Sequence, residues 1–322
     1  MSPRVVVTGG AGFLGSHVCE RLLDRGDEVI CVDNLSTGLL ANLDRLLKAD
    51  RFSMLYADVA IAIPVRGPID KLLHLASPAS PPHYLAHPLE TLEVNSRGTQ
   101  LCLELAAEHH ARFLLASTSE VYGEPARHPQ GEDYWGNVSP IGPRSVYDEG
   151  KRFAEALVTA WQRLGRTNAV IARLFNTYGP RLRPDDGRVI SNFLSQALAG
   201  RELTVYGDGT QTRSFCFVDD TVTGLLALLE SDMTGPVNIG HPDEHTVLEV
   251  ANLVRTLCGT SAGIRYESLP ADDPSRRCPD IRLAKDSLGW KPKITLTDGL
   301  QRTAEWMRRQ LGLGQTTPSG HG

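Results

Sequence analysis

Tyr147 and Lys151 are the two residues whose types and spacing most directly suggest chemistry. They stand four positions apart in a predicted helix over Val146–Leu164, so their side chains project from one face. A tyrosine with its usual pKa of ~10 is a weak base at neutral pH. Nearby positive charge, from an ammonium group among others, would favour the phenolate and make proton transfer possible. Alone, such a pair more often means a packed ring beside a solvated lysine.

A glycine-rich segment near the N-terminus provides a context for this pair. Gly9, Gly12 and Gly15 follow a predicted strand, Arg4–Thr8, and open a predicted helix, Phe13–Arg25. Gly9 permits a tight turn, Gly12 lets a pyrophosphate approach the backbone, and Gly15 lets the helix pack close to the sheet. The free N–H groups at the helix N-terminus suit phosphates. The segment therefore predicts a dinucleotide site.

Two acidic residues at strand ends bear on which dinucleotide is bound. Asp33 directly follows the strand Glu28–Val32. A carboxylate there binds the adenosine ribose hydroxyls and repels a 2′-phosphate, so we expect NAD rather than NADP. Asp58, after the strand Phe52–Tyr56, is a weaker candidate for an adenine contact and could equally be a solvated acid. The positive nicotinamide ring of NAD would then supply further charge beside Tyr147.

The elements that must position these residues alternate between strands and helices. Such alternation predicts βαβ units and a Rossmann-type, doubly wound parallel sheet of the α/β class. The further predicted elements are the strands Phe52–Tyr56, Lys71–Leu75, Arg112–Ala116 and Ala169–Leu174, and the helix Leu89–His109.

Beyond residue 175 the pattern loosens, and loops rich in Gly, Pro and Asp separate short elements. We expect residues 1–175 to form the NAD-binding domain, and 176–314 mainly a smaller interleaved substrate lobe with some segments returning to the sheet. The tail, 315–322, is expected to be disordered. The predicted loops are Thr177–Gly187, Gly207–Arg213 and Pro270–Asp280.

Composition excludes several classes of protein. The net charge of −5 over 322 residues does not favour a nucleic-acid or anionic-membrane surface. The six cysteines are scattered without CxxC pairs, so neither a disulfide nor a metal site is expected. The sequence shows no signal peptide and no apolar stretch long enough to span a membrane, which predicts a cytoplasmic protein.

Several motifs together resemble the extended short-chain dehydrogenases/reductases. These are the glycine loop, the Tyr-x-x-x-Lys pair, the strand end Ala-Ser-Thr-Ser-Glu at 116–120, and segments at 95–99 and 173–180 that resemble NxxGT and RxxNxYGP. Within this superfamily, from about residue 4 to 312, the chain resembles the UDP-glucuronate decarboxylase family. The segments that carry this closer resemblance lie at 74–82, 132–136, 140–144, 147–151, 187–193 and 272–280.

The resemblance implies NAD-dependent conversion of UDP-glucuronate to UDP-xylose. Oxidation at C4 makes a ketone β to the C5 carboxylate, CO2 leaves, and the hydride returns to C4. Tyr147 would take and return the C4 hydroxyl proton. Lys151 would lower the tyrosine pKa and hold the nicotinamide ribose. Thr118 would hydrogen-bond near the C4 oxygen.

Glu120 and Arg277 carry the distinction within the superfamily. The related 4,6-dehydratases have Asp-Glu after the threonine, whereas this chain has Ser119-Glu120 and so lacks the dehydratase acid. Glu120 is therefore expected to assist sugar positioning or proton transfer, as in the decarboxylases. Arg277 would serve the diphosphate or the protonation step, although the adjacent Arg276 leaves the choice between the two arginines open.

The resemblance also implies the remaining contacts and a homodimer built from a four-helix interface, two helices from each subunit. The helices would be Leu89–His109 and the Tyr147 helix. The expected NAD contacts are Gly9, Gly12, Phe13, Leu14, Gly15, Asp33, Asn34, Thr37, Gly38, Asp58, Val59, Leu75, Tyr147 and Lys151. The expected UDP-sugar contacts are Pro81, Tyr84, Ser119, Glu120, Asn176, Arg188, Val189, Tyr206, Gln211, Arg213 and Arg277.

Three alternative functions remain open on the sequence. One is an oxidative decarboxylase that releases NADH and a UDP-4-keto-pentose. Another is a UDP-glucuronate 4-epimerase, against which Glu120 and Arg277 argue. The last is a catalytically inactive NAD sensor, which would need the glycine loop but no proton relay, so that Tyr147 and Lys151 argue against it.

Overall fold

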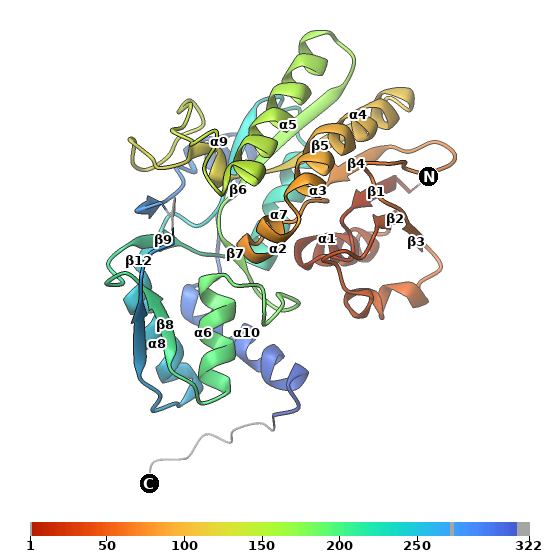
Figure 1. Ribbon diagram of the computed structural model, residues 1–322. Helices are drawn as coiled ribbons and strands as arrows, with labels where there is room; N and C mark the ends of the chain where they lie inside the picture. The colour runs from red at the N-terminus through yellow and green to blue at the C-terminus, as the bar shows by residue number, and fades with distance from the viewer. Residues whose placement is uncertain (1, 271–273, 314–322) are drawn as a thin grey trace.

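A seven-stranded parallel sheet forms the centre of the molecule (Figure 1), whose computed structural model describes residues 2–270 and 274–313. The strand order is β11-β6-β5-β4-β1-β2-β3, so the chain winds outward in both directions from the boundary between β1 and β4. This confirms the predicted doubly wound sheet. The strands are β1 (Arg4–Thr8), β2 (Glu28–Asp33), β3 (Phe52–Tyr56), β4 (Lys71–His74), β5 (Arg112–Thr118), β6 (Asn168–Leu174) and β11 (Pro236–Ile239).

Helices cover both faces of the sheet. Val5 and Val7 of β1 point into one apolar core with residues of α1 (Phe13–Asp24) and α7 (Val218–Leu229). Val6, between them, belongs to a second core on the opposite face. That core includes residues of α4 (Thr99–Glu108) and α5 (Ser145–Arg163). Because both faces are buried, the strands are continuous apolar runs rather than alternating ones.

The helix predicted over Leu89–His109 is not one regular α-helix. It runs as α3 (Pro88–Glu93), a π-helical turn η3 (Val94–Gly98) and then α4. Asn95 lies within the π-helical turn and packs closely on Gly150 of α5, where a Cβ would lie 3.3 Å from Asn95, so a side chain there would need Asn95 to shift slightly. The wider turn thus allows a close contact between η3 and α5.

The second half of the chain builds a smaller group of elements beside the sheet (Figure 1). β11 rejoins the main sheet beside β6. Three predicted loops were wrong in part, because they contain strands of two or three residues, which are too short to show a periodic pattern: β7 (Thr177–Tyr178), β9 (Thr212–Ser214) and β14 (Arg276–Arg277). The elements are α6 (Val189–Leu198), β8 (Leu203–Tyr206), β9 (Thr212–Ser214), β12 (Glu244–Thr246), α8 (Val247–Cys258), β13 (Ile264–Glu267), β14 (Arg276–Arg277) and α10 (Leu296–Gln310).

The remaining elements are short connections. They are η1 (Leu40–Leu43), η2 (Leu46–Lys48), α2 (Pro81–Ala86), η4 (Ser119–Tyr122), β7 (Thr177–Tyr178), β10 (Cys216–Phe217) and α9 (Arg282–Leu288). The predicted disordered tail, 315–322, lies outside the described residues, as do residues 271–273 of the predicted loop Pro270–Asp280. Within the described part of the chain, we find no helix of sufficient length and apolarity to cross a bilayer. The cytoplasmic location stays a prediction from the sequence.

Candidate active site

The glycine-rich turn between β1 and α1 forms one end of a cavity of about 700 Å³. Gly9 has a left-handed φ of 72°, and a Cβ there would lie 2.7 Å from the backbone nitrogen of Ala76. At Gly15 a Cβ would lie 2.1 Å from the Gly9 carbonyl oxygen, so the helix approaches the turn too closely for any side chain. The α1 helix begins at Phe13 without a side-chain cap, leaving its first N–H groups for a phosphate. This cradle fits a dinucleotide pyrophosphate.

Asp33, at the end of β2, lies in the cavity wall with its carboxylate held by the backbone. Its oxygens accept hydrogen bonds from the N–H groups of Ala11 (2.9 Å) and Leu35 (2.8 Å). Burial raises the pKa of Asp33, and these two bonds oppose the rise. Gly38 packs against this carboxylate: a Cβ at Gly38 would lie 2.9 Å from the Asp33 Oδ1. Gly38 itself does not line the cavity. The Asp33 carboxylate is therefore held in a fixed orientation at the cavity wall, with Gly38 packed against it, and its contact with ribose hydroxyls stays a prediction.

Asp58 also lines the cavity, but its carboxylate is engaged in local structure. One oxygen accepts the Ala60 N–H at 2.8 Å, and the other accepts the side-chain amide of Asn34 at 3.0 Å. These bonds organise the turn after β3. Asp58 thus serves as an ordinary turn residue on the cavity wall, and its adenine contact stays a prediction.

Tyr147 and Lys151 lie at the carboxyl ends of the central strands, in the first two turns of α5. The Tyr147 ring stacks on Tyr84, with ring centroids 5.2 Å apart and planes 5° apart. Its hydroxyl is hydrogen-bonded to Thr118, the last residue of β5. The Lys151 Nζ lies 5.9 Å from the centroid of the Tyr147 ring and donates to the Ala116 carbonyl at 2.8 Å. The predicted pair therefore shares one wall of the cavity.

The pKa values of this pair differ from the sequence-based expectation. Burial and the negative charge of Glu120 raise the pKa of Tyr147, and the hydrogen bond from Thr118 only partly opposes them. Burial lowers the pKa of Lys151 to about 7, against the charge of Glu155. The physical reason is that the phenol and the amine are both desolvated. Burial, with the charge of Glu120, thus keeps Tyr147 protonated, and the positive nicotinamide ring of a bound NAD would favour the phenolate.

Glu120 sits between two arginines in the same cavity. Both of its oxygens are paired with Arg277, one of them at 2.8 Å, and Arg144 lies 2.9 Å from the second oxygen. Burial opposes ionisation of Glu120, but the charges of Arg277 and Arg144 outweigh it and lower the pKa to about 2. Arg277 is buried, whereas the neighbouring Arg276 is exposed. The structure thus places Arg277, and not Arg276, beside Glu120.

Nearly all the predicted contacts meet in this one cavity. With the exception of Gly38, every predicted NAD contact lines it. Arg188 reaches it from the start of α6, paired with Asp186 at 2.9 Å between Nη2 and Oδ2. The sugar-side predictions that line the cavity are Pro81, Tyr84, Ser119, Glu120, Asn176, Arg188, Val189, Tyr206, Gln211, Arg213 and Arg277.

Sequence reasoning did not predict several charged residues of the cavity lining, Arg144 and Asp186 among them, nor one ring contact. Arg144 stands three residues before Tyr147, so one helical turn brings the guanidinium over the same end of the cavity as Glu120. Asp186 precedes Arg188 by two residues, a spacing that could have suggested the pair. The stacking of Tyr84 on Tyr147 joins α2 to α5 and has no local signal in the sequence.

Known proteins resemble this chain along nearly its whole length. UDP-glucuronic acid decarboxylase 1 of Arabidopsis thaliana is 52% identical over 96% of this chain and 70% of its own length. UDP-glucuronic acid decarboxylase 6 of the same plant is 50% identical over 96% of this chain and 90% of its own length. The crystal structure of the UDP-glucuronic acid 4-epimerase from Bacillus cereus with UDP-glucuronic acid and NAD has a TM-score of 0.85. The sequence of this epimerase is 29% identical to the present chain, and the alignment covers 95% of the present chain and 99% of the epimerase chain.

A family-wide pattern agrees with these individual likenesses. The pattern of the NAD dependent epimerase/dehydratase family matches residues 5–240, from the first strand of the sheet to the end of β11. That range contains the glycine turn, Asp33, Glu120 and the pair formed by Tyr147 and Lys151. The predictions of an extended short-chain dehydrogenase/reductase and of NAD as cofactor are thereby confirmed. The chain belongs to the NAD dependent epimerase/dehydratase family.

Proposed function

We propose that the chain converts UDP-glucuronate to UDP-xylose and CO2, with NAD restored at the end of each turnover. The observation that carries this proposal is Glu120, whose carboxylate is held between Arg277 and Arg144 in the same cavity as Tyr147. Ser119 stands where the related dehydratases carry their acid, so elimination of a hydroxyl group has no proton donor there. The relatives named as decarboxylases, at 50% to 52% identity, support the same assignment.

The proton relay is the first task of the chain's own residues. A bound NAD would supply the acceptor for the hydride of C4 and the source of the hydride that returns. Tyr147 takes the proton of the C4 hydroxyl and gives it back when the ketone is reduced. Thr118, hydrogen-bonded to the Tyr147 hydroxyl, holds that oxygen in place. Lys151 is kept beside the ring by its bond to the Ala116 carbonyl.

The second task is to direct the transient ketone towards loss of CO2. A ketone at C4 is β to the C5 carboxylate, so the bond to CO2 can break and leave an enolate. The hydroxyls of Tyr147 and Thr118, which lie next to each other, would stabilise the developing negative charge on the C4 oxygen. Arg188 and Arg213 line the far part of the cavity, where guanidinium groups suit a diphosphate.

The products formed from UDP-glucuronate test this proposal directly. Purified protein with NAD is incubated with UDP-glucuronate, and CO2, absorbance of NADH and the sugar NMR spectrum are followed together. We expect CO2 and UDP-xylose in equal amounts with no net NADH. Stoichiometric NADH with a keto pentose would instead identify an oxidative decarboxylase. UDP-galacturonate without CO2 would identify a 4-epimerase and refute decarboxylation.

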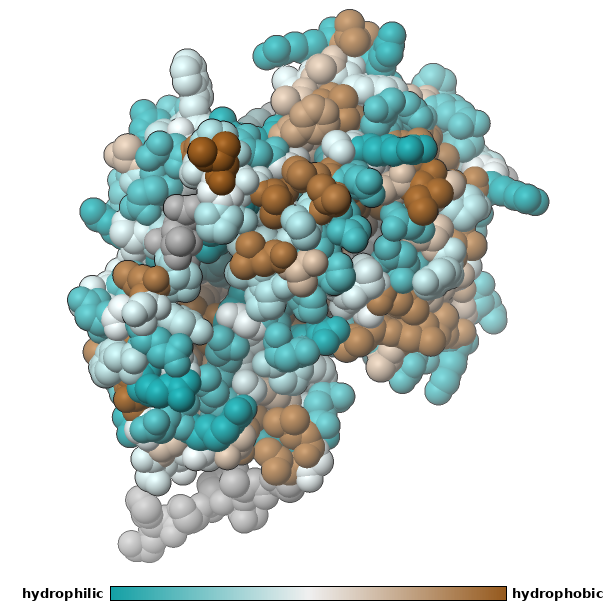
Figure 2. All heavy atoms as spheres, in the orientation of Figure 1, coloured by the Kyte–Doolittle hydropathy of each residue, from teal (hydrophilic) through white to brown (hydrophobic). Residues whose placement is uncertain are grey.

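We also propose that the chain is a homodimer through α3 and α5. Large apolar side chains are exposed on these neighbouring helices: Leu89 is 70% exposed and Phe153 is 51% exposed. Figure 2 shows several brown groups over the upper half of the molecule, where α3 and α5 lie in Figure 1. Apolar side chains gathered on adjacent helices are typical of an association surface.

A charge placed in this surface should separate the subunits. Phe153→Glu is expected to raise the dimer dissociation constant by at least roughly 10²-fold, because a carboxylate would be buried at the interface. Light scattering after size exclusion measures the change in mass. Tyr266→Glu, at a position 55% exposed in β13, is the matched control and should leave the dimer intact. A Phe153→Glu protein that stays dimeric would show that α5 lies outside the interface.

A further inference from the structure

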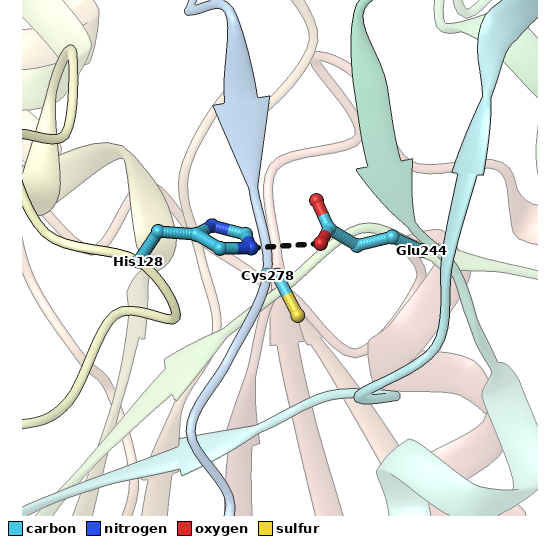
Figure 3. A group of neighbouring side chains, drawn as sticks. All are labelled: His128, Glu244 and Cys278. Carbon is cyan, nitrogen blue, oxygen red and sulfur yellow. Dashed lines mark ion pairs between the residues drawn. The ribbon is translucent and has the colours of Figure 1, made fainter.

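Three side chains with metal-binding atoms meet on the side of the second lobe, outside the cavity described above (Figure 3). His128 lies in the loop after η4, Glu244 in β12, and Cys278 directly after β14. One candidate ligand atom of each residue lies within 4.8 Å of the other two. The His128 Nε2 and a Glu244 carboxylate oxygen are 2.8 Å apart. Segments far apart in the sequence thus present an imidazole, a carboxylate and a thiol to one point.

The surroundings hold the carboxylate in place and leave access from solvent. The second oxygen of Glu244 accepts a hydrogen bond from the Thr212 hydroxyl at 2.7 Å. Bonds of this kind fix the orientation of a ligating carboxylate. The His128 side chain is 31% exposed and that of Glu244 is 24% exposed, whereas Cys278 is buried. An ion could therefore enter from the His128 side, and water could occupy a remaining coordination position.

The donor set and its spacing favour one ion. Imidazole, thiolate and carboxylate are together typical of Zn²⁺, whereas Mg²⁺ and Ca²⁺ prefer oxygen ligands alone. Tetrahedral zinc holds such ligand atoms roughly 3.5 Å apart. Any separation near the limit of 4.8 Å would have to close by about an ångström, and the 2.8 Å between His128 and Glu244 would have to open by less than that, both within the range of side-chain rotation. We propose that His128, Glu244 and Cys278 form an open zinc-binding site with three protein ligands and a water.

Coordination by the thiol requires a change of partner. The Cys278 Sγ now donates to the Pro242 carbonyl oxygen at 3.1 Å. On binding, the thiol proton passes to solvent and the sulfur forms its bond to zinc. Without metal, the same contacts would be an ordinary ion pair between His128 and Glu244 beside a buried thiol. Sequence reasoning predicted no metal site, because these three residues show no ligand spacing along the chain.

The site adjoins the strand that carries Arg277. Cys278 follows Arg277 directly, and its backbone N–H donates to the side-chain oxygen of Gln130 at 2.8 Å. The Gln130 N–H donates in return to the Cys278 carbonyl at 2.9 Å. In addition, β12 and β14 flank β9, with Arg277 beside Arg213 in register. A zinc ion would therefore tie the His128 loop, β12 and the segment after β14 together, and would restrain Arg277 beside Glu120.

Metal binding to the full chain tests the proposal without reference to catalysis. Protein stripped of metal is titrated with Zn²⁺ in competition with a chromophoric chelator, and separately with Co²⁺ as a spectroscopic probe. We expect one ion per chain and a thiolate-to-cobalt charge-transfer band in the near ultraviolet. Cys278→Ser should abolish that band, and both Cys278→Ser and His128→Gln should weaken zinc binding by at least roughly 10²-fold.

Two matched variants separate this site from other metal binding. Cys258→Ser and His110→Gln change the same residue types outside the cluster and should keep the zinc affinity and the cobalt band. Thermal melting shows whether each variant is folded. Hydrogen exchange of residues 274–280 should slow when zinc binds. Zinc binding that is absent, or that survives both Cys278→Ser and His128→Gln in folded protein, would overturn the proposal.

Discussion

Turnover of UDP-glucuronate by a Tyr147→Phe protein is expected to fall by about 10²–10⁴-fold, while NAD binding persists. The substitution removes a single hydroxyl, the group that is hydrogen-bonded to Thr118. The ring itself keeps its stacking on Tyr84, at 5.2 Å between centroids, so the wall of the cavity is preserved. The pyrophosphate cradle at Gly9 and Gly15 is also untouched. The initial rate of CO2 release measures turnover, and a fluorescence titration measures the affinity for NAD.

The control for Tyr147→Phe is another buried tyrosine hydroxyl. Tyr122 is 1% exposed, and its hydroxyl donates to Asn238 at 2.8 Å, outside the cavity. Tyr122→Phe should lower the stability by about 1–3 kcal/mol, because the Asn238 oxygen loses its partner, yet leave turnover nearly unchanged. A Tyr147→Phe protein that keeps turnover within roughly tenfold of the parent would refute the proton relay.

The parts of the fold that were predicted correctly follow from patterns confined to short stretches of chain. The strand Arg4–Thr8 is buried on both faces, so its continuous apolar run is visible without any knowledge of its neighbours. The glycine turn is equally local, because Gly9 and Gly15 are required by one close approach between adjacent elements. The short strands β9 and β14 exist only through pairing with each other and with β12, and no local pattern reveals them.

In the candidate site too, some residues could be predicted from local motifs and others could not. Motifs locate Tyr147, Lys151 and Glu120, because the spacing itself indicates the chemistry. They do not reveal that Arg144 reaches Glu120, nor that Arg277 rather than Arg276 is buried beside it, since both depend on how separate loops meet. The shifted pKa values of Tyr147 and Lys151 also could not be predicted from the sequence. They depend on desolvation, which only the folded surroundings determine.

Glu120→Gln is the second substitution with a large expected effect. Gln keeps the size of the side chain but removes the negative charge that Arg277 and Arg144 share. Both guanidinium groups would then repel each other and shift within the cavity. A displacement of about an ångström near reacting groups costs roughly 10²-fold in rate, so we expect kcat to fall by that order. Steady-state kinetics with UDP-glucuronate measure the change.

The dependence of kcat on pH distinguishes the two roles that the sequence left open for Glu120. Its pKa of about 2 means that the carboxylate is ionised throughout the neutral range, which suits an orienting role rather than a proton carrier. Glu120→Gln should therefore lower kcat evenly and keep both limbs of the pH profile. A limb that disappears in Glu120→Gln would instead identify Glu120 as a group that gains and loses a proton during turnover.

The loss of stability in Glu120→Gln has to be separated from its loss of rate. A lowered pKa in the folded state stabilises the protein above the unfolded value of 4.5, and this contribution disappears as the pH falls towards about 2. Asp27→Asn breaks another acid–arginine pair, in which the acid is buried and the side chain of its partner Arg25 is 33% exposed, directly before β2 and outside the cavity. It should lower the melting temperature while kcat stays near that of the parent. If Asp27→Asn slows turnover as much as Glu120→Gln does, general destabilisation and not the position of Glu120 explains the effect.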